Sequence, residues 1–292
     1  MRRLALAILF LAFAVLATAS RAADRPVAVV AAETFYGDVI QQVGGSRVKV
    51  VSILSNAEQD PHHFEPSPST ARAVADARLV VYNGADYDPW MARLLRASRA
   101  PARRVIVVAD LVGKRAGDNP HIWYDPATMP ALARAVASAL AQADPDGRAE
   151  YGRRLQAFLE SLAPIDAKIA AIRGKFAGID VTATEPIFGY MAQALGLTMR
   201  NRRFQLSIMN ETEPRASDIA AFQKDLATRT VKVLFYNNQT GDDLTERLLK
   251  IARESKVPVV GVGETLPPGS TYRDWVLKQL DAVEAALAAP PP

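Results

Sequence analysis

Short apolar runs and amphipathic helical stretches alternate along the first half of the chain. Valine-rich runs predict strands at residues 27–32, 48–54, 79–82 and 105–108. A helical pattern over 35–43 ends at Gly44-Gly45. Two further helices are predicted to start at Ser67-Pro68 and at Asp125-Pro126, because a capping residue before a proline is typical of a helix start. Alternating strands and helices predict an α/β fold with mostly parallel sheets.

A long helical stripe crosses the middle of the chain. Apolar residues recur at alternating intervals of four and three from Tyr151 to Ile172, which is the pattern of an amphipathic helix. We predict a helix over residues 145–174 that ends at Gly174 and is kinked at Pro164, because proline removes an intrahelical hydrogen bond. Its length favours a connector between two lobes over an ordinary core helix.

The alternation resumes after this helix. Strands are predicted at 181–184, 231–236 and 257–262, and helices at 187–195, 242–255 and 272–288. Because single cores rarely grow beyond about 250 residues, we expect two βα lobes, 23–144 and 175–292, joined by the helix 145–174. We expect Glu211 and Glu213 to cap the next helix. Asn237-Asn238-Gln239 is predicted to be an ordinary turn, although it could line the cleft between the lobes. The tail at 290–292 is predicted to be disordered.

The N-terminal residues have the pattern of an export signal. Arg2 and Arg3 precede an almost unbroken apolar run from Leu4 to Ala17, and Ser20-Arg21-Ala22 offers the small residues that signal peptidase prefers. The run is shorter than the roughly 20 apolar residues that a membrane span needs. We therefore assign residues 1–22 to a signal peptide and expect a soluble, periplasmic protein.

Charge and cysteine content exclude several classes of protein. The chain has 35 Lys+Arg against 31 Asp+Glu, and without Arg2, Arg3 and Arg21 the basic count falls to 32, so the exported chain carries a net charge of +1. A near-neutral net charge argues against nucleic acid, which needs a concentrated basic face, and against an electrostatic membrane anchor. No cysteine is present, which excludes a disulfide, a thiolate nucleophile and a lipid anchor on cysteine. We expect a monomer with no nucleic-acid partner and no direct membrane anchor.

All three histidines lie in two proline-bounded loops, and this pattern predicts a metal site. His62 and His63 follow Asp60-Pro61, and His121 follows Asn119-Pro120. In open α/β sheets, ligands bind beyond the carboxyl ends of the strands, where two carboxylates also follow predicted strands. Two imidazoles and two carboxylates, one pair from each lobe, predict a closed site for a divalent cation formed by His62, His121, Glu185 and Glu264.

Each of these residues has a structural alternative. The histidines could be solvated loop residues, and His63 could replace His62, although we interpret it as a rim residue. Glu185 could be an acid that stabilises a helix N-terminus, and Glu264 could be a surface carboxylate. Trp123 and Tyr124 are interpreted as packing residues rather than ligand contacts.

The sequence also resembles a known family, the zinc/manganese-specific solute-binding proteins of bacterial ABC importers, over essentially the whole exported chain. The matching segments are Asp60-Pro61-His62 with Glu65-Pro66-Ser67-Pro68, Asn119-Pro120-His121-Ile122-Trp123, Glu185 with Phe188-Gly189-Tyr190, and Val262-Gly263-Glu264-Thr265. The resemblance implies two lobes joined by a rigid helix, a buried metal between them, and an inner-membrane ABC permease as partner. By motif position the family's four ligands fall on His62, His121, Glu185 and Glu264.

Two departures from the family bear on the metal. The fourth ligand is usually aspartate, whereas Glu264 stands here, and the His/Asp-rich loop of many zinc-specific members is absent. Glutamate as third ligand is associated by the resemblance with manganese, but imidazole suits zinc, so the cargo is Zn²⁺ or Mn²⁺.

We interpret the chain as a binding protein rather than an enzyme. It contains no Gly-x-Ser-x-Gly elbow and no His-Glu-x-x-His helix, and four protein ligands would leave no open position for catalysis. The alternatives are a periplasmic zinc-dependent hydrolase, in which Glu185 or Glu264 is a general base off the metal, and a binding protein for a metal chelate.

Overall fold

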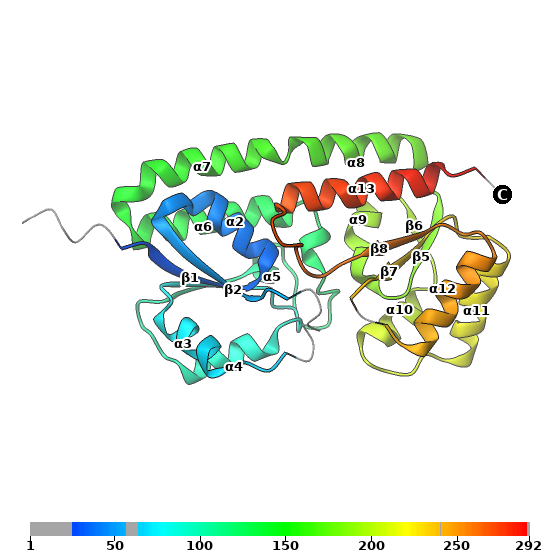
Figure 1. Cartoon of the computed structure of the whole chain (residues 1–292), viewed down its shortest axis with the longest axis horizontal. Coiled ribbons are helices and arrows are strands. Elements are labelled where there is room, and N and C mark those ends of the chain that lie inside the picture. Colours follow the sequence, from blue (N-terminus) through cyan, green and yellow to red (C-terminus); the bar gives the residue numbers. More distant parts are fainter. Residues whose placement is uncertain (1–24, 57–63, 240, 291–292) are drawn as a thin grey trace, which may run out of the picture.

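The structure is a computed structural model that describes residues 25–56, 64–239 and 241–290. The predicted signal peptide, His62, His63 and the last two residues of the predicted tail therefore lie outside the described residues. Two α/β lobes lie side by side, and long helices run along both of them (Figure 1). Within the described part of the chain, no helix has the length and apolar character needed to cross a membrane.

The N-terminal lobe is built on a four-stranded parallel sheet. Its strands are β1 (Val27–Glu33), β2 (Val48–Leu54), β3 (Leu79–Tyr82) and β4 (Arg104–Val107), in the order β2-β1-β3-β4. The helices of this lobe are α2 (Thr34–Gly44), α3 (Pro68–Asp76), α4 (Pro89–Ala97), α5 (Val108–Leu111) and α6 (Thr128–Ala143). Short 3₁₀ turns lie at Gly45–Arg47, Ile122–Tyr124 and Pro145–Gly147. The Ser67 hydroxyl accepts a hydrogen bond from the amide of Thr70, which confirms the predicted cap of α3.

The C-terminal lobe repeats the same topology. Its strands are β5 (Asp180–Ala183), β6 (Thr198–Met199), β7 (Leu234–Asn237) and β8 (Val259–Val262), in the order β6-β5-β7-β8. Its helices are α9 (Gly189–Ala194), α10 (Arg202–Met209), α11 (Ala216–Ala227), α12 (Asp243–Glu254) and α13 (Tyr272–Ala288), with a 3₁₀ turn at Pro186–Phe188. In both lobes the second strand of the sequence lies at an edge, and the first and third are central.

The predicted central helix is two helices. α7 (Arg148–Ser161) and α8 (Ala163–Phe176) meet at Leu162, and Pro164 lies in the first turn of α8. Proline needs no amide hydrogen bond in the first turn, so the chain starts a new helix there instead of kinking one helix. α8 also continues two residues beyond the predicted end at Gly174. Figure 1 shows α7 above the N-terminal lobe, α8 above the C-terminal lobe and α13 alongside α8.

Burial on both faces of each sheet explains the unbroken apolar runs that mark the strands. In β1, Val29 and Ala31 belong to a large core shared by both lobes, whereas Val30 and Ala32 pack in a separate cluster with residues of α3 and α4. The C-terminal sheet has the same arrangement, with a second local cluster that contains residues of α10, α11 and α12. The shared core therefore holds the lobes together beneath the long helices.

Several local predictions need correction. Glu213 does not cap α11, because its N-cap is Arg215 and no side chain makes the capping hydrogen bond. Asp125 does not begin α6 directly, since its carboxylate accepts from the amide of Ala127 and the helix begins at Thr128. α4, α10 and β6 were not predicted, and β7 and β8 begin later than the apolar runs that mark them.

Candidate metal site

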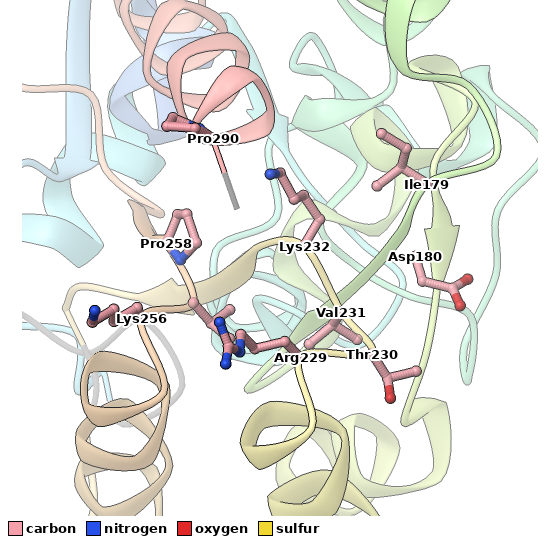
Figure 2. A pocket seen from close by; sticks show the side chains of 10 residues that line it. Ile179, Asp180, Arg229, Thr230, Val231, Lys232, Lys256, Pro258 and Pro290 are labelled. Carbon is pink, nitrogen blue, oxygen red and sulfur yellow. The ribbon is translucent and has the colours of Figure 1, made fainter. Parts of the chain in front are cut away.

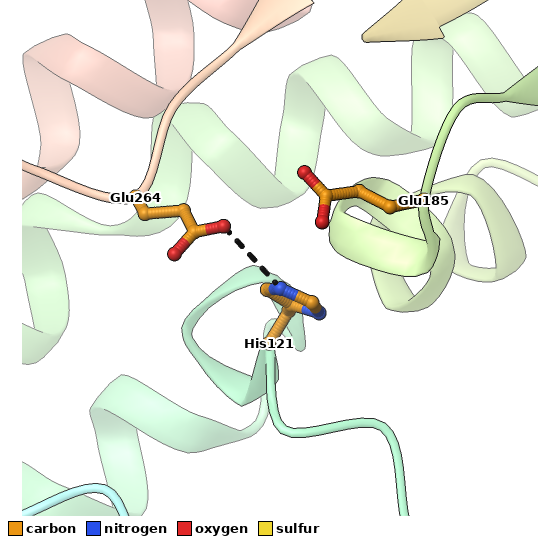
Figure 3. A group of neighbouring side chains, drawn as sticks. All are labelled: His121, Glu185 and Glu264. Carbon is orange, nitrogen blue, oxygen red and sulfur yellow. Dashed lines mark ion pairs between the residues drawn. The ribbon is translucent and has the colours of Figure 1, made fainter. Parts of the chain in front are cut away.

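Three of the four predicted ligands lie together where the lobes meet. One ligand atom from each of His121, Glu185 and Glu264 can be chosen so that all three lie within 4.8 Å of one another, and all three residues are buried. His121 Nε2 lies 3.5 Å from Glu264 Oε1. Figure 3 shows the two carboxyl groups pointing toward the imidazole from the C-terminal lobe. The fourth predicted ligand, His62, lies outside the described residues.

The two carboxylates come from parallel strands of one sheet. Glu185 follows the last residue of β5 after Thr184, and Glu264 follows the last residue of β8 after Gly263. Because β5 and β8 both flank β7 and run parallel to it, their carboxyl ends meet at one edge of the sheet. Glu185 occupies the N-cap position of the 3₁₀ turn that follows, and its side chain makes no capping hydrogen bond there.

His121 reaches the site from a long loop that is fixed by the opposite lobe. The Asn119 amide nitrogen donates to the carbonyl of Pro186 at 2.7 Å, and the Tyr190 hydroxyl donates to the carbonyl of Asn119 at 2.8 Å. On the other side, the Tyr124 hydroxyl lies 2.8 Å from the carbonyl of Gly263. The loop that carries His121 is thus attached next to Glu185 and next to Glu264.

The same amide of Asn119 determines the tautomer of His121. Since its nitrogen donates to Pro186, its oxygen must face His121, where it accepts from the backbone amide at 3.1 Å and from Nδ1 at 2.6 Å. Nδ1 therefore carries the proton, and neutral imidazole then has its lone pair on Nε2. This nitrogen is buried and has no hydrogen-bond partner among the described residues.

The site therefore presents electron-pair donors that converge from both lobes. When both carboxylates are ionised, they and the lone pair of Nε2 repel one another unless a cation lies between them. Neutral imidazole that is oriented by a hydrogen bond on its other nitrogen is the form of histidine that binds transition metals. The described part of the site thus fits a divalent metal chemically.

A second acidic pair lies in the N-terminal lobe beside the site. Glu33, at the end of β1, contacts Asp88, and burial followed by the charge of Asp88 raises the pKa of Glu33 well above its usual value. Burial also raises the pKa of Asp88, to about 6, although the amides of Gly84 and Asn83 donate to its carboxylate and oppose the shift. We infer that Glu33 holds the proton of the pair.

A surface pocket of about 300 Å³ lies elsewhere, at the start of the strands of the C-terminal sheet. Figure 2 shows Arg229, Lys232 and Lys256 around it, with Asp180 at one side. Since β5 begins at Asp180, this pocket is at the opposite edge of the sheet from Glu185. It contains none of the predicted ligands.

Comparison with known proteins identifies the family. The model of the family described as zinc-uptake complex component A, periplasmic, matches residues 29–286. The chain belongs to this family. It is 24% identical to the metal ABC transporter substrate-binding lipoprotein SsaB of Streptococcus sanguinis over 281 residues, which cover 89% of each chain. It is 23% identical to a manganese ABC transporter substrate-binding lipoprotein of Streptococcus gordonii, over 97% of this chain and 98% of the relative.

Solved structures show the same fold. The periplasmic zinc-binding protein TroA from Treponema pallidum superposes with a TM-score of 0.75 at 21% identity, over 91% of this chain and 100% of that one. A manganese-bound periplasmic metal-binding protein from Candidatus Liberibacter asiaticus gives a TM-score of 0.71 at 18% identity, over 89% and 98% of the two chains. Family membership confirms the predicted resemblance and the two-lobed α/β fold, and it makes the chain a solute-binding protein for metal uptake rather than an enzyme.

Two of the four polar residues around the candidate ligands were named in the sequence analysis as a turn that could line the cleft. These are Asn237 and Gln239, and both contact Glu264: the Asn237 amide donates to its carboxylate, and its backbone amide donates to the Gln239 side chain. Asn119 and Tyr87 were not considered, although Asn119 lies two residues before His121 and Tyr87 lies in the loop after β3. Tyr87 and Asn237 both follow predicted strands, 79–82 and 231–236, and this position was the available sign that they lie near a ligand site. The packing roles predicted for Trp123 and Tyr124 are confirmed, since both side chains are buried among aromatic rings.

Proposed function

We propose that this protein captures a zinc or manganese ion with His62, His121, Glu185 and Glu264 and delivers it to an ABC permease. The observation that carries the proposal is the buried convergence of His121 Nε2 with the two carboxylates within 4.8 Å. Two carboxylates supply the charge that balances a divalent cation, and the position of His62 in the chain makes it the fourth ligand. The printed names of the relatives include both zinc and manganese binders.

The proposal extends to the organisation of the chain. Residues 1–22 act as a signal peptide, 23–144 and 175–292 form the two lobes, and 145–174 connects them. The arrangement of α7 and α8 along the two lobes supports a connector with limited bending, and we expect only modest motion of the lobes.

The proposal also covers localisation and assembly. The family is described as periplasmic, whereas the streptococcal relatives are named lipoproteins. These 292 residues contain no cysteine to which a lipid could be attached. We therefore propose that the exported protein works as a monomer in the periplasm without an acylated cysteine, and that an inner-membrane permease receives the metal.

Metal-dependent stability tests the proposal directly. Protein stripped with a chelator should unfold at a higher temperature after Zn²⁺ or Mn²⁺ is added, because binding only to the folded state stabilises it by about 2.7 kcal/mol at a free metal concentration of 100 times Kd. Native mass spectrometry should show one bare divalent ion per chain. An unchanged melting temperature with both metals would refute the proposal.

The two adjacent histidines provide a matched pair of variants. His62→Ala should weaken binding of both metals strongly, whereas His63→Ala, which removes the same side chain one position further on, should leave both affinities nearly unchanged. Isothermal titration of the two variants gives the comparison. Equal losses, or a loss only in His63→Ala, would assign the fourth ligand differently.

The proposed ligands also predict how affinity depends on pH. Metal binds to ionised carboxylates and neutral imidazoles, so protons compete with it, and affinity should fall as the solution becomes acidic. Titrations from neutral to acidic pH in one non-chelating buffer series measure this fall. An affinity that stays constant over this range would contradict the ligand set.

A further inference from the structure

Glu264 lies in the segment 263–271, which connects β8 with α13 and forms neither a strand nor a helix. Its first residues are held within the C-terminal lobe, because the Gln239 side chain accepts from the amide of Glu264 and donates to the Thr265 hydroxyl at 3.0 Å. Since the backbone amides of the segment take no part in a helix or a sheet, they need partners elsewhere in the fold. The partners after Thr265 therefore determine how firmly the segment is held on the far side of Glu264.

Helix α2 of the N-terminal lobe supplies two of these partners. The amide of Leu266 donates to the hydroxyl oxygen of Thr34 at 3.0 Å, and the amide of Tyr272 donates to the carboxylate of Asp38 at 2.8 Å. Residues four positions apart lie on the same face of a helix, so one face of α2 holds the chain at both points. The loop that carries a candidate ligand of one lobe is thus attached to the other lobe.

The start of α13 is fixed in the N-terminal lobe as well. Tyr272 is buried, and its hydroxyl donates to the carbonyl of Trp123 at 2.8 Å. The ring of Trp275 stacks on that of Phe35 in α2, with 6.0 Å between the ring centroids. Figure 1 shows α13 starting beside α2 and then running over the C-terminal lobe alongside α8. α13 is therefore anchored in one lobe and packed along the other.

We propose that Thr34 and Asp38 are positioning residues of the metal site, which hold the segment after Glu264 in place before metal arrives. Neither is among the proposed ligands. A segment that is already ordered by hydrogen bonds does not have to be ordered when the metal binds. Without these bonds, binding must fix the freed residues, and fixing the backbone of a single residue lowers affinity by about tenfold. The inference rests on the proposed function, in which Glu264 is a ligand.

Two pairs of variants test this role. Thr34→Val keeps the shape of the side chain but loses the acceptor, whereas Thr34→Ser retains it. Asp38→Ala removes the second acceptor, whereas Asp38→Asn keeps a side-chain oxygen that can accept from Tyr272. In competition titrations with a chelator, we expect Thr34→Val and Asp38→Ala each to bind Zn²⁺ and Mn²⁺ about tenfold more weakly. Thr34→Ser and Asp38→Asn should stay close to the unmodified protein.

Thr228→Val is the matched control, because the Thr228 hydroxyl donates to the carbonyl of Lys224 inside α11, at 2.8 Å. This variant should keep both affinities. Denaturant unfolding of the metal-free proteins separates a purely structural role from a positioning role. If Thr34→Val and Asp38→Ala lowered the free energy of unfolding but left both affinities unchanged, the inference would be overturned while the proposed function stood.

The conservative variants give a second way to contradict the inference. If Thr34→Ser lost as much affinity as Thr34→Val, the hydroxyl acceptor would not be what positions the segment. Should Thr34→Val fail to fold, the Asp38 pair decides in the same way. If the unmodified protein bound neither metal, the proposed function and this inference would both fail.

Discussion

The two lobes share one strand order but deliver their candidate ligands in different ways. In the C-terminal lobe, Glu185 and Glu264 lie within two residues of the ends of β5 and β8, so the sheet itself sets their positions. In the N-terminal lobe, His121 comes ten residues after α5 and is positioned by hydrogen bonds to the other lobe. One lobe therefore uses its sheet as a rigid support, whereas the other uses a loop that depends on its partner lobe.

This difference matters for how the site can open. Since the loop of His121 is hydrogen-bonded beside both carboxylates, these three residues should move as one unit. The described part of the site is then preassembled before metal arrives, and a preassembled site loses less conformational freedom on binding. Three variants test these two modes of positioning, and a fourth tests the acidic pair beside the site. The expected effect decreases from His121→Ala through Asn119→Ala and Tyr124→Phe to Glu33→Gln.

His121→Ala should have the largest effect. It removes the donor at the centre of the described group and leaves two buried carboxylates without an imidazole between them. We expect both Zn²⁺ and Mn²⁺ to bind more weakly by more than the roughly 100-fold that can follow from loss of an outer-shell partner. Isothermal titration measures this loss, and a melting curve in chelator verifies folding. Binding within tenfold of the unmodified protein would show that His121 is not a ligand.

Asn119→Ala should have the next largest effect, because Asn119 sets the tautomer of His121 and ties its loop to Pro186. Loss of such an outer-shell partner typically lowers metal affinity by about 10–100-fold. Asn210→Ala is the control, since Asn210 is an exposed residue at the end of α10. Equal affinities of the two variants would mean that the loop is positioned without help from the opposite lobe.

Tyr124→Phe should affect folding stability more than metal binding. The hydroxyl lies 2.8 Å from the carbonyl of Gly263 and 2.7 Å from the side-chain oxygen of Gln279, and it donates one proton between these two buried acceptors. Leaving buried acceptors unsatisfied costs about 1–3 kcal/mol. Denaturant unfolding of the metal-free protein measures this cost. A free energy of unfolding that stays within error of the unmodified value would show that this link between the lobes contributes nothing.

Glu33→Gln should have the smallest effect, which is visible as a change in the pH dependence of stability. The pKa of Glu33 is raised in the folded protein, so the folded state keeps a proton that the unfolded state releases. Stability therefore falls as pH rises from the unfolded value near 4.5 toward the folded pKa. Glutamine cannot titrate, so this part of the fall should disappear.

Unfolding at several pH values, without metal, tests this last prediction. The charged and titratable groups around Glu33 are Asp88, Tyr36 and Tyr87, and Asp88 remains in the variant, so some pH dependence should persist. If the variant and the unmodified protein lost stability in parallel as pH rose, Glu33 would not be the proton carrier of the pair.

The sequence by itself determined the fold class, the family and the candidate ligands. Apolar runs with valine predict the strands because both faces of each sheet are buried, and prolines and capping residues such as Ser67 predict helix starts through local geometry alone. His62 and His121 were found because histidine is scarce and is confined to proline-bounded loops. These signals are local, so they can be read without a structure.

Only the tertiary structure decided how the candidate ligands are held. The hydrogen bonds of Glu264 with Tyr87 and of Asn119 with Pro186 join residues that lie 177 and 67 positions apart in the chain. No local pattern encodes such pairs, and Asn237 accordingly resembled an ordinary turn residue in the sequence. The break at Leu162 also depended on context, because proline is compatible with both a kinked helix and the first turn of a new one. The sequence names the donors, and the packing of the two lobes sets their orientation.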